Sequence, residues 1–191
     1  MAADAAGRGS VEVIEGERAR LRTVRVEDLP QIVAWQNDPE TTRFMGGPMG
    51  TTVEGEWSRL LADEEAGERT TWAIEDLADQ RLIGVIGLHT IIRHHYRARI
   101  FLLLGRIADR GRGYGTDALR CLLSWAFTSG GLHRVSMRVL PENAALLRCA
   151  EKCGFQREGV SRESWFADGQ FHDDVRLAIL EQDWRGPVAP D

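Results

Sequence analysis

The stretch Ile100-Phe101-Leu102-Leu103-Leu104 leads into Arg110-Gly111-Arg112-Gly113-Tyr114-Gly115-Thr116, and these two runs decide the fold. The first run is apolar and suits a buried strand, and the second opens an amphipathic helical pattern. Alternating glycines let successive backbone N–H groups turn toward one point, and a helix start adds partial positive charge. The two arginines can bind phosphate oxygens. The pattern predicts an anion site between a strand and a helix.

Two known glycine motifs do not fit this loop. A P-loop needs Gly-Lys-Ser/Thr at the helix start, and that run is absent. A dinucleotide fingerprint needs Gly-x-Gly-x-x-Gly in an early βαβ unit, whereas Gly111-x-Gly113-x-Gly115 comes late in the chain. Taken alone, the loop leaves open a glycine-rich turn that binds no ligand.

Other elements surround the loop in an irregular alternation. Strands are predicted over residues 20–24, 70–74, 82–90, 98–104, 133–140, 155–165 and 171–180, and helices over 26–35, 52–66, 114–129 and 143–153. Asp28 is expected to cap the first helix, and Asp168-Gly169 to turn the last hairpin. The order β-α-α-β-β-β-α-β-α-β-β predicts an α/β (α+β) fold with a mixed sheet.

Length and composition indicate one globular domain. A chain of 191 residues with 43% apolar and 28% charged residues is long and apolar enough for a single core, which excludes a disordered chain. Residues 1–10 are expected to form a flexible tail and residues 11–191 a single domain. The net charge of −5 disfavours nucleic acid as a partner and is compatible with a cationic amine.

The remaining compositional features concern compartment and metals. The N-terminus lacks the apolar run of a signal peptide, and no stretch approaches the roughly 20 apolar residues of a membrane span. A cytoplasmic protein without membrane association is therefore expected. Cys121, Cys149 and Cys153 lack zinc-site spacing and are interpreted as reduced thiols. The histidine-containing run 93–99 also carries arginines, which oppose a cation, so no metal site is predicted.

Further stretches accompany the loop in a fixed order. They are Trp35-Gln36-Asn37-Asp38-Pro39, Gly131-Leu132-His133-Arg134-Val135, Pro141-Glu142-Asn143, Glu151-Lys152-Cys153-Gly154-Phe155, Glu158-Gly159 and Asp168-Gly169. With Arg110-x-x-Gly113-x-Gly115, they resemble the GCN5-related N-acetyltransferase (GNAT) superfamily from about Ala19 to Trp184. The branch of spermidine and ribosomal-protein N-terminal acetyltransferases is the most similar. The resemblance implies a single mixed, mostly antiparallel sheet, splayed at the cofactor site, with helices on both faces.

The same resemblance implies a site for acetyl-CoA and no metal. The backbone of Leu103, Leu104 and Gly105 would pair with the pantetheine arm as an added strand does. Asn143 and Lys152 match positions that reach the cofactor, although a helix cap and an exposed helical lysine are alternatives. The residues that would hold the pyrophosphate are Arg110, Gly111, Arg112, Gly113, Tyr114, Gly115 and Thr116.

The implied reaction moves an acetyl group to a primary amine. An amine with a pKa of about 10 must lose a proton before it attacks, and a carboxylate or a bound water can accept that proton. Backbone N–H groups would polarise the thioester carbonyl. The acceptor stays open among a polyamine, a protein N-terminus, an antibiotic and another small-molecule amine. Relatives are often homodimers, so a homodimer is one possible assembly.

The catalytic positions depart from the family pattern. Ala150 stands where relatives often have a tyrosine acid, and Leu146 stands where the ribosomal-protein branch has a serine. Arg99 follows Ala98 where relatives often have Ala-Glu. Water could still protonate a departing thiolate whose pKa is about 8.5. A catalytically impaired acyl-CoA-binding or regulatory domain is therefore the second hypothesis, and a nucleotide-binding protein of unrelated fold is the third.

Glu163 is the candidate base, because Ser161-Arg162-Glu163 lies on a strand that lines the acceptor side in relatives. For this glutamate, an ordinary surface role is the competing interpretation. Trp165 and Phe166 are candidates for stacking on the acceptor, with core packing as the default. The acceptor pocket is expected from residues 45–52 and the last hairpin. Further candidate bases, each with a simpler structural or solvated role, are His89, His172 and Asp173.

Overall fold

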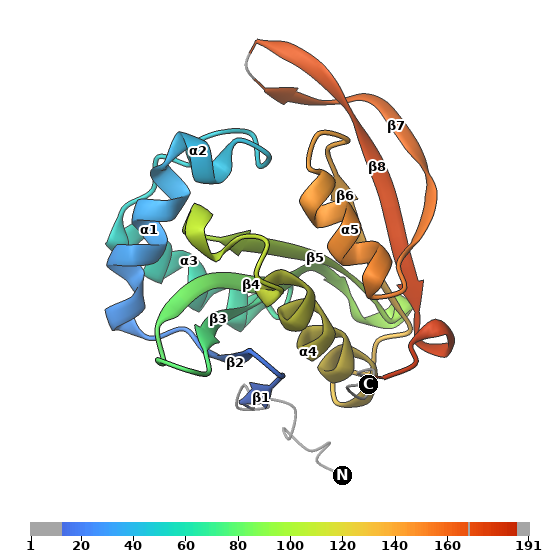
Figure 1. Cartoon of the computed structure of the whole chain (residues 1–191), viewed down its shortest axis with the longest axis horizontal. Coiled ribbons are helices and arrows are strands. Elements are labelled where there is room, and N and C mark those ends of the chain that lie inside the picture. Colours follow the sequence, from blue (N-terminus) through green and yellow to red (C-terminus); the bar gives the residue numbers. More distant parts are fainter. Residues whose placement is uncertain (1–12, 168, 187–191) are drawn as a thin grey trace.

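A computed structural model describes residues 13–167 and 169–186, in which one eight-stranded sheet forms the centre (Figure 1). The strand order is β1-β2-β3-β4-β5-β6-β8-β7, and every neighbouring pair is antiparallel except β5 and β6. The predicted mixed, mostly antiparallel sheet is confirmed. The strands are β1 (Ile14–Glu15), β2 (Ala19–Thr23), β3 (Thr70–Asp76), β4 (Leu82–Ile92), β5 (Arg97–Leu104), β6 (Arg134–Val139), β7 (Gln156–Ala167) and β8 (Gln170–Leu180).

The helices agree with the predicted segments to within a few residues, with one addition. They are α1 (Leu29–Asn37), α2 (Pro39–Thr42), α3 (Val53–Ala66), α4 (Tyr114–Thr128) and α5 (Ala144–Lys152), with 3-10 turns η1 (Val26–Asp28), η2 (Arg93–His95), η3 (Ile107–Asp109) and η4 (Glu181–Asp183). The addition is α2. Asp38 ends α1, and its carboxylate then accepts the N–H groups of Glu40 and Thr41, so it starts a new turn.

Asp28 does not act as the predicted cap. It stands at the N-cap position of α1, but its side chain accepts no capping hydrogen bond from that helix. Its carboxylate instead receives two hydrogen bonds from the guanidinium of Arg22 and one from the N–H of Arg25. Arg22 is buried, and leaving a buried cation without a carboxylate partner costs more free energy than leaving a helix without a side-chain cap.

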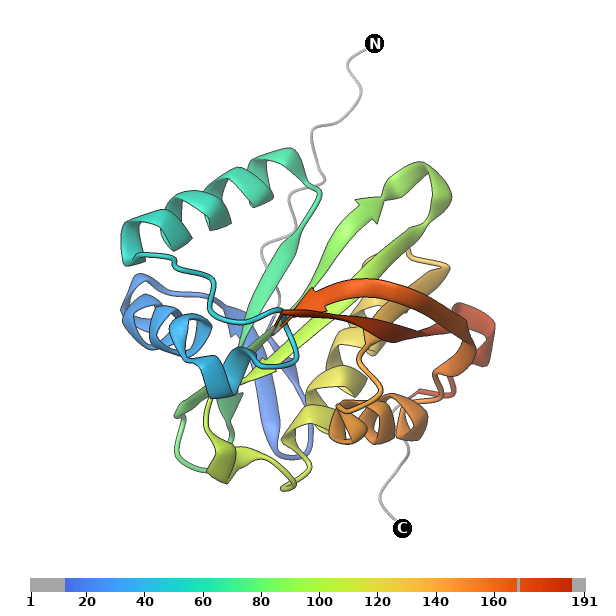
Figure 2. The same ribbon diagram turned by 90° about the horizontal axis from the view of Figure 1, so that it is seen from above.

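Helices cover both faces of the sheet, as expected. Along β3, Trp72 and Ile74 point into the larger apolar cluster, which includes Leu119 and Leu122 of α4. Ala73, between them, points the other way and belongs to a second cluster with residues of α1. Side chains alternate across a strand, so these two clusters are the two faces of one sheet. Figure 2 shows α1 and α3 on one side and α4 and α5 on the other.

The sheet splays where β5 and β6 separate. Their parallel pairing covers only Arg97↔Arg134, Ala98↔Val135 and Arg99↔Ser136. Beyond Arg99, β5 continues to Leu104 paired with β4 alone, and β6 continues with β8. The end of β5 therefore has one unpaired edge, which leads directly into the glycine loop. This confirms the predicted splay.

The β7–β8 hairpin reaches back across the open end of the sheet (Figure 2). Its Trp165 ring packs on the α2–α3 loop, where a Cβ added to Gly46 would stand 3.2 Å from the ring. Gly169 has a φ of 77°, which suits the predicted turn, whereas Asp168 lies outside the described residues. The predicted tail over residues 1–10 also lies outside them. Within the described ranges, none of the helices has the length and apolar character needed to cross a membrane.

Candidate active site

The glycine loop presents a row of free backbone N–H groups. Gly111 and Gly113 have φ values of 74° and 90°, the left-handed region that glycine adopts without strain, and Gly113 is the N-cap of α4. None of the N–H groups of residues 111–116 donates a hydrogen bond to another described residue. A loop and helix start with unpaired N–H groups form a concave site for an anion.

Two buried carboxylates beneath the loop, one in an ion pair and one in a hydrogen bond, hold it in this shape. Arg81 donates two hydrogen bonds of 2.9 Å to the carboxylate of the buried Asp109, and these bonds lower the pKa of Asp109. The hydroxyl of Tyr114 donates to Oδ2 of Asp76 at 2.5 Å, which lowers the pKa of that carboxyl and raises the pKa of the phenol. The Tyr114 side chain therefore anchors the loop, and only its N–H remains available to a ligand.

The guanidinium groups of the two loop arginines, Arg110 and Arg112, make different contacts with the rest of the protein. Nη2 of Arg110 lies 3.5 Å from the carbonyl oxygen of Leu104, so this guanidinium covers the free end of β5. Arg112 is more than half exposed, with its guanidinium 5.4 Å from the centre of the Tyr114 ring and 3.8 Å from Asp109. Both cations flank the row of N–H groups, and neither is locked in a buried pair.

Of Leu103, Leu104 and Gly105, only Leu104 has backbone N–H and C=O groups that face the splay. Gly105 donates its N–H to the carbonyl of Ile83, and its own carbonyl accepts the hydroxyl of Thr41. Hydrogen-bonding groups alternate along an antiparallel strand, so Leu103 also faces β4, whereas Leu104 and Leu102 face the splay. Gly105 has a packing role as well, because an added Cβ would lie 1.9 Å from the Trp35 ring.

The remaining predicted cofactor residues lie on α5. The carboxamide oxygen of Asn143 accepts the N–H of Leu146, so this residue is the helix cap. Its amide nitrogen forms no hydrogen bond within the described part of the chain. Lys152 is exposed at the last turn of α5. The first turn of α4 packs against this helix at Cys149, whose Sγ would stand 3.6 Å from a Cβ on Gly115.

The candidate base Glu163 lies on β7, away from any regular strand pairing. This residue lies in a bulge between Ser161 and Trp165, with a φ of 49° that is unusual for a side chain other than glycine. Its N–H donates to Oδ1 of Asp173, and its exposed side chain lines neither of the two cavities described below. Ala150 is fully buried, and its methyl group has no proton to give to a leaving thiolate.

A cavity of about 360 Å³ lies between α2, the end of β6 and the hairpin. His172 lines it, with Nε2 3.3 Å from the carbonyl oxygen of Ala167 and Nδ1 3.9 Å from Glu142. His89 lies elsewhere, on β4 beside Arg69 and Arg99. Burial and these two cations lower the pKa of His89 to about 4, so its imidazole is neutral near pH 7.

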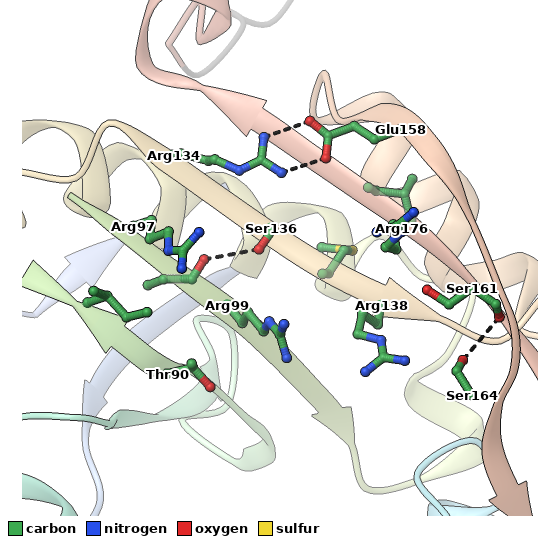
Figure 3. A pocket seen from close by; sticks show the side chains of 14 residues that line it. Thr90, Arg97, Arg99, Arg134, Ser136, Arg138, Glu158, Ser161, Ser164 and Arg176 are labelled. Carbon is green, nitrogen blue, oxygen red and sulfur yellow. Dashed lines mark hydrogen bonds and ion pairs between the residues drawn. The ribbon is translucent and has the colours of Figure 1, made fainter. Parts of the chain in front are cut away.

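A second cavity, of about 480 Å³, lies on the sheet face opposite α4 and was not predicted (Figure 3). Arginines from three strands line it. Arg134, Ser136 and Arg138 alternate along β6 and so share a face, but nothing in the sequence shows which strands lie beside them. No group of His, Cys, Asp and Glu that could hold a metal ion occurs among residues 13–167 and 169–186.

The splayed strands and the glycine loop lie in a region that matches a known family. The family described as "Acetyltransferase (GNAT) domain" matches residues 18–156. The chain belongs to the GNAT acetyltransferase family. The matched region contains the splayed strands, the glycine loop and α4 and α5, so the resemblance drawn from the loop and its accompanying stretches is confirmed.

Individual GNAT relatives agree with the suspected branch. The chain is 34% identical over 178 residues to a "Probable N-acetyltransferase YjcK" of Bacillus subtilis, covering 90% of this chain and 98% of that protein. A "Putative ribosomal N-acetyltransferase YdaF" of the same organism is 30% identical over 135 residues, with 71% and 70% covered. A spermidine N-acetyltransferase of Vibrio cholerae, solved in complex with CoA and spermine, has the same fold, with a TM-score of 0.80, 24% identity, and 86% and 96% covered.

Proposed function

We propose that this GNAT protein transfers an acetyl group from acetyl-CoA to a primary amine. The observation that carries the proposal is the row of unpaired N–H groups at residues 111–116, placed where a splayed strand meets a helix. An anion at this point would be held by several N–H donors, the start of α4 and two guanidinium groups. The pyrophosphate of coenzyme A is the anion that fits the family.

The strand edge supports the proposal for the rest of the cofactor. The N–H and C=O groups of Leu104 and Leu102 face the opening between β5 and β6, where an extended amide chain can pair with them. Arg110 now contacts the Leu104 carbonyl, and a rotation toward a phosphate would release that carbonyl. Binding the phosphates and opening the strand edge would then be coupled through one side chain.

The chemistry needs little from charged side chains. The amine nitrogen forms a bond to the acetyl carbon, the carbon–sulfur bond breaks, and the proton lost by the amine passes to a base or to water. Because Ala150 is buried and apolar, we propose that water protonates the departing thiolate. Among the candidate bases, His172 is the one that lines a cavity beside the hairpin, whereas Glu163 lines none.

The test measures cofactor binding and turnover separately. Arg110→Ala and Arg112→Ala should each weaken coenzyme A binding about tenfold in calorimetry, because each removes a charge-assisted hydrogen bond. Arg185→Ala, which removes an exposed arginine outside both cavities, should leave the affinity unchanged. An unchanged affinity in Arg110→Ala would count against the loop as the phosphate site.

Turnover is followed as thiol release with a panel of primary amines. Thiol release with any amine supports an acetyltransferase, and release should fall to the level of acetyl-CoA hydrolysis when the amine is omitted. Tight binding of acetyl-CoA with no release on any amine would favour the catalytically impaired domain. Effective competition by ATP or NAD against coenzyme A would favour a nucleotide-binding protein.

A further inference from the structure

The larger cavity lies on the sheet face opposite α4, and residues of β7 complete its lining. Its lining is rich in arginine and hydroxyl groups and contains one carboxylate, which belongs to Glu158. In Figure 3, the arginine side chains stand on neighbouring strands around a common space. The five arginines are Arg97 and Arg99 of β5, Arg134 and Arg138 of β6, and Arg176 of β8.

Strand register places like charges directly beside each other on this face. Arg97 is the partner of Arg134 across β5 and β6, and Arg138 is the partner of Arg176 across β6 and β8. Like charges that stand opposite each other destabilise a sheet. A sequence whose net charge is −5 therefore carries a local excess of positive charge on this face. An anion bound there would relieve the repulsion.

Carboxylates of the chain neutralise only part of this charge. Glu158 forms a bidentate pair with Arg134, and Asp174 binds Arg138. Arg97, Arg99 and Arg176 form no ion pair with another described residue. These three guanidinium groups are the ones available to a ligand.

The rim of the cavity is prearranged by a buried carboxylate. Asp174 is 2% exposed, and its Oδ2 accepts hydrogen bonds from Arg138 and from the hydroxyl of Ser164. Ser164 stands there because the bulge of β7 between Ser161 and Trp165 turns the strand over the sheet. Arg138 is thereby fixed in place, and Oδ1 of Asp174 has no partner within the described residues.

The position of the cavity connects it with the splay. Arg99↔Ser136 is the last pair before β5 and β6 separate. Ala98 and Ile100 of β5 point into the cluster around α4, so Arg99 points to the opposite face. The cavity thus begins at the closed end of the splay, on the side from which an acceptor could approach a group held between the strands.

We propose that this arginine cavity binds an anionic part of the acceptor, so that the acceptor is an amine that also carries a carboxylate or phosphate group. The proposal rests on the acetyl transfer proposed above and names its substrate class. A polyamine presents only cations, which Arg97, Arg99 and Arg176 repel. A carboxylate or phosphate forms charge-assisted hydrogen bonds with the same groups.

The first experiment compares three acceptors that differ only at the end remote from the reacting amine. They are 5-aminopentanoate, 5-aminopentanamide and 1,5-diaminopentane, whose remote groups are negative, neutral and positive. The kcat/KM should fall in that order, with at least a tenfold difference between the first two, carried mainly by KM. Arg99→Gln and Arg176→Gln should each remove most of this difference, and Arg99→Glu should reverse the order. Arg185→Gln is the control and should change nothing.

The second experiment measures anion binding without turnover. Citrate is titrated in a thermal-unfolding assay with coenzyme A present in excess, so that the glycine loop is already filled. Citrate should raise the Tm of the wild type and should raise it much less in the variant R97Q/R99Q/R176Q. That variant should also be at least as stable as the wild type without citrate, because it removes like-charge repulsion.

Each result separates the two proposals. Equal citrate responses in wild type and triple variant, or no preference for the carboxylate acceptor, would overturn the anionic acceptor. A citrate response confined to the wild type, with no acetyl transfer to any amine, would keep the anion site and overturn the proposed function. Dissociation of a dimer in the triple variant, without any citrate effect in the wild type, would assign the face to a second copy and overturn the acceptor proposal.

Discussion

The glycine loop and the arginine cavity are both suited to anions, but they are built in different ways. The loop uses backbone N–H groups of consecutive residues, and its supporting carboxylates are paired beneath it by Arg81 and Tyr114. The cavity uses side chains from β4, β5, β6, β7 and β8, and three of its arginines have no ion pair with a described residue. A site made of backbone can be recognised along the chain, whereas a site made of side chains depends on the register of the sheet.

The largest expected effect comes from the junction of β5 with the loop. Gly105→Ala should lower the free energy of unfolding by about 3 kcal/mol or more, because the new Cβ would overlap the buried Trp35 ring. The measurement is urea unfolding monitored by fluorescence. Gly111→Ala meets no atom within 4 Å and changes only a left-handed φ, so it should cost about 1 kcal/mol.

A double variant decides whether the overlap is the cause. If Gly105→Ala is destabilising because of Trp35, then G105A/W35A should cost clearly less than the sum of the two single changes. Additive costs would mean that the new Cβ acts through something other than its contact with the Trp35 ring, since Gly105 has no left-handed φ that alanine would strain. The stability of the junction between β5 and the glycine loop would then not depend on the close packing of Gly105 against Trp35.

The sequence predicted the loop side well for a physical reason. A strand, alternating glycines and a helix start act over neighbouring residues, so their geometry follows from local rules. The splay was expected from the resemblance, and the narrower free edge at Leu104 became visible only because Gly105 bonds to Ile83 and Thr41. The short helix α2 was not predicted, and it begins at Asp38 because one carboxylate can end α1 and also cap the following turn.

The acceptor side was much less predictable. Glu163 was predicted from its place on a strand, and the positive φ that a bulge gives it could not be predicted, because bulges leave little trace in a sequence. The arginine cavity was missed because Arg97 and Arg134 are neighbours only through the parallel pairing of β5 and β6. Arg138 and Arg176 likewise meet only through the pairing of β6 with β8.

A smaller effect is expected from the anchor of the loop. Tyr114→Phe should lower the free energy of unfolding by about 1–2 kcal/mol, because buried Asp76 loses a hydrogen bond to its carboxylate. Coenzyme A affinity should fall about threefold to fivefold, and the citrate response of the arginine cavity should be unchanged. Tyr96→Phe is the matched control, because Tyr96 is 61% exposed and its hydroxyl binds no described residue. Equal effects of Tyr114→Phe and Tyr96→Phe would show that the hydrogen bond between Tyr114 and Asp76 does not anchor the loop.

The smallest effect concerns His89, which lies on β4 opposite Arg99 of the arginine cavity. Burial, Arg69 and Arg99 lower its pKa to about 4 from the 6.5 of an unperturbed histidine. The unfolded chain therefore binds the proton more tightly, and the stability associated with neutral His89 is complete above pH 6.5 and is lost as the pH falls toward 4.

Wild type and His89→Gln should thus differ in the pH dependence of unfolding. Relative to the variant, the wild type should lose about 1 kcal/mol between pH 7 and pH 5, once the partial exposure of the imidazole is allowed for. The measurement is urea unfolding of both proteins at a series of pH values. The difference between them isolates His89, because the other titratable groups are the same in both proteins. Saturating citrate should shrink the difference, because an anion near Arg99 reduces the repulsion that lowers the histidine pKa. A difference that does not respond to citrate would show that burial and Arg69 set the pKa of His89 without a contribution from Arg99 of the arginine cavity.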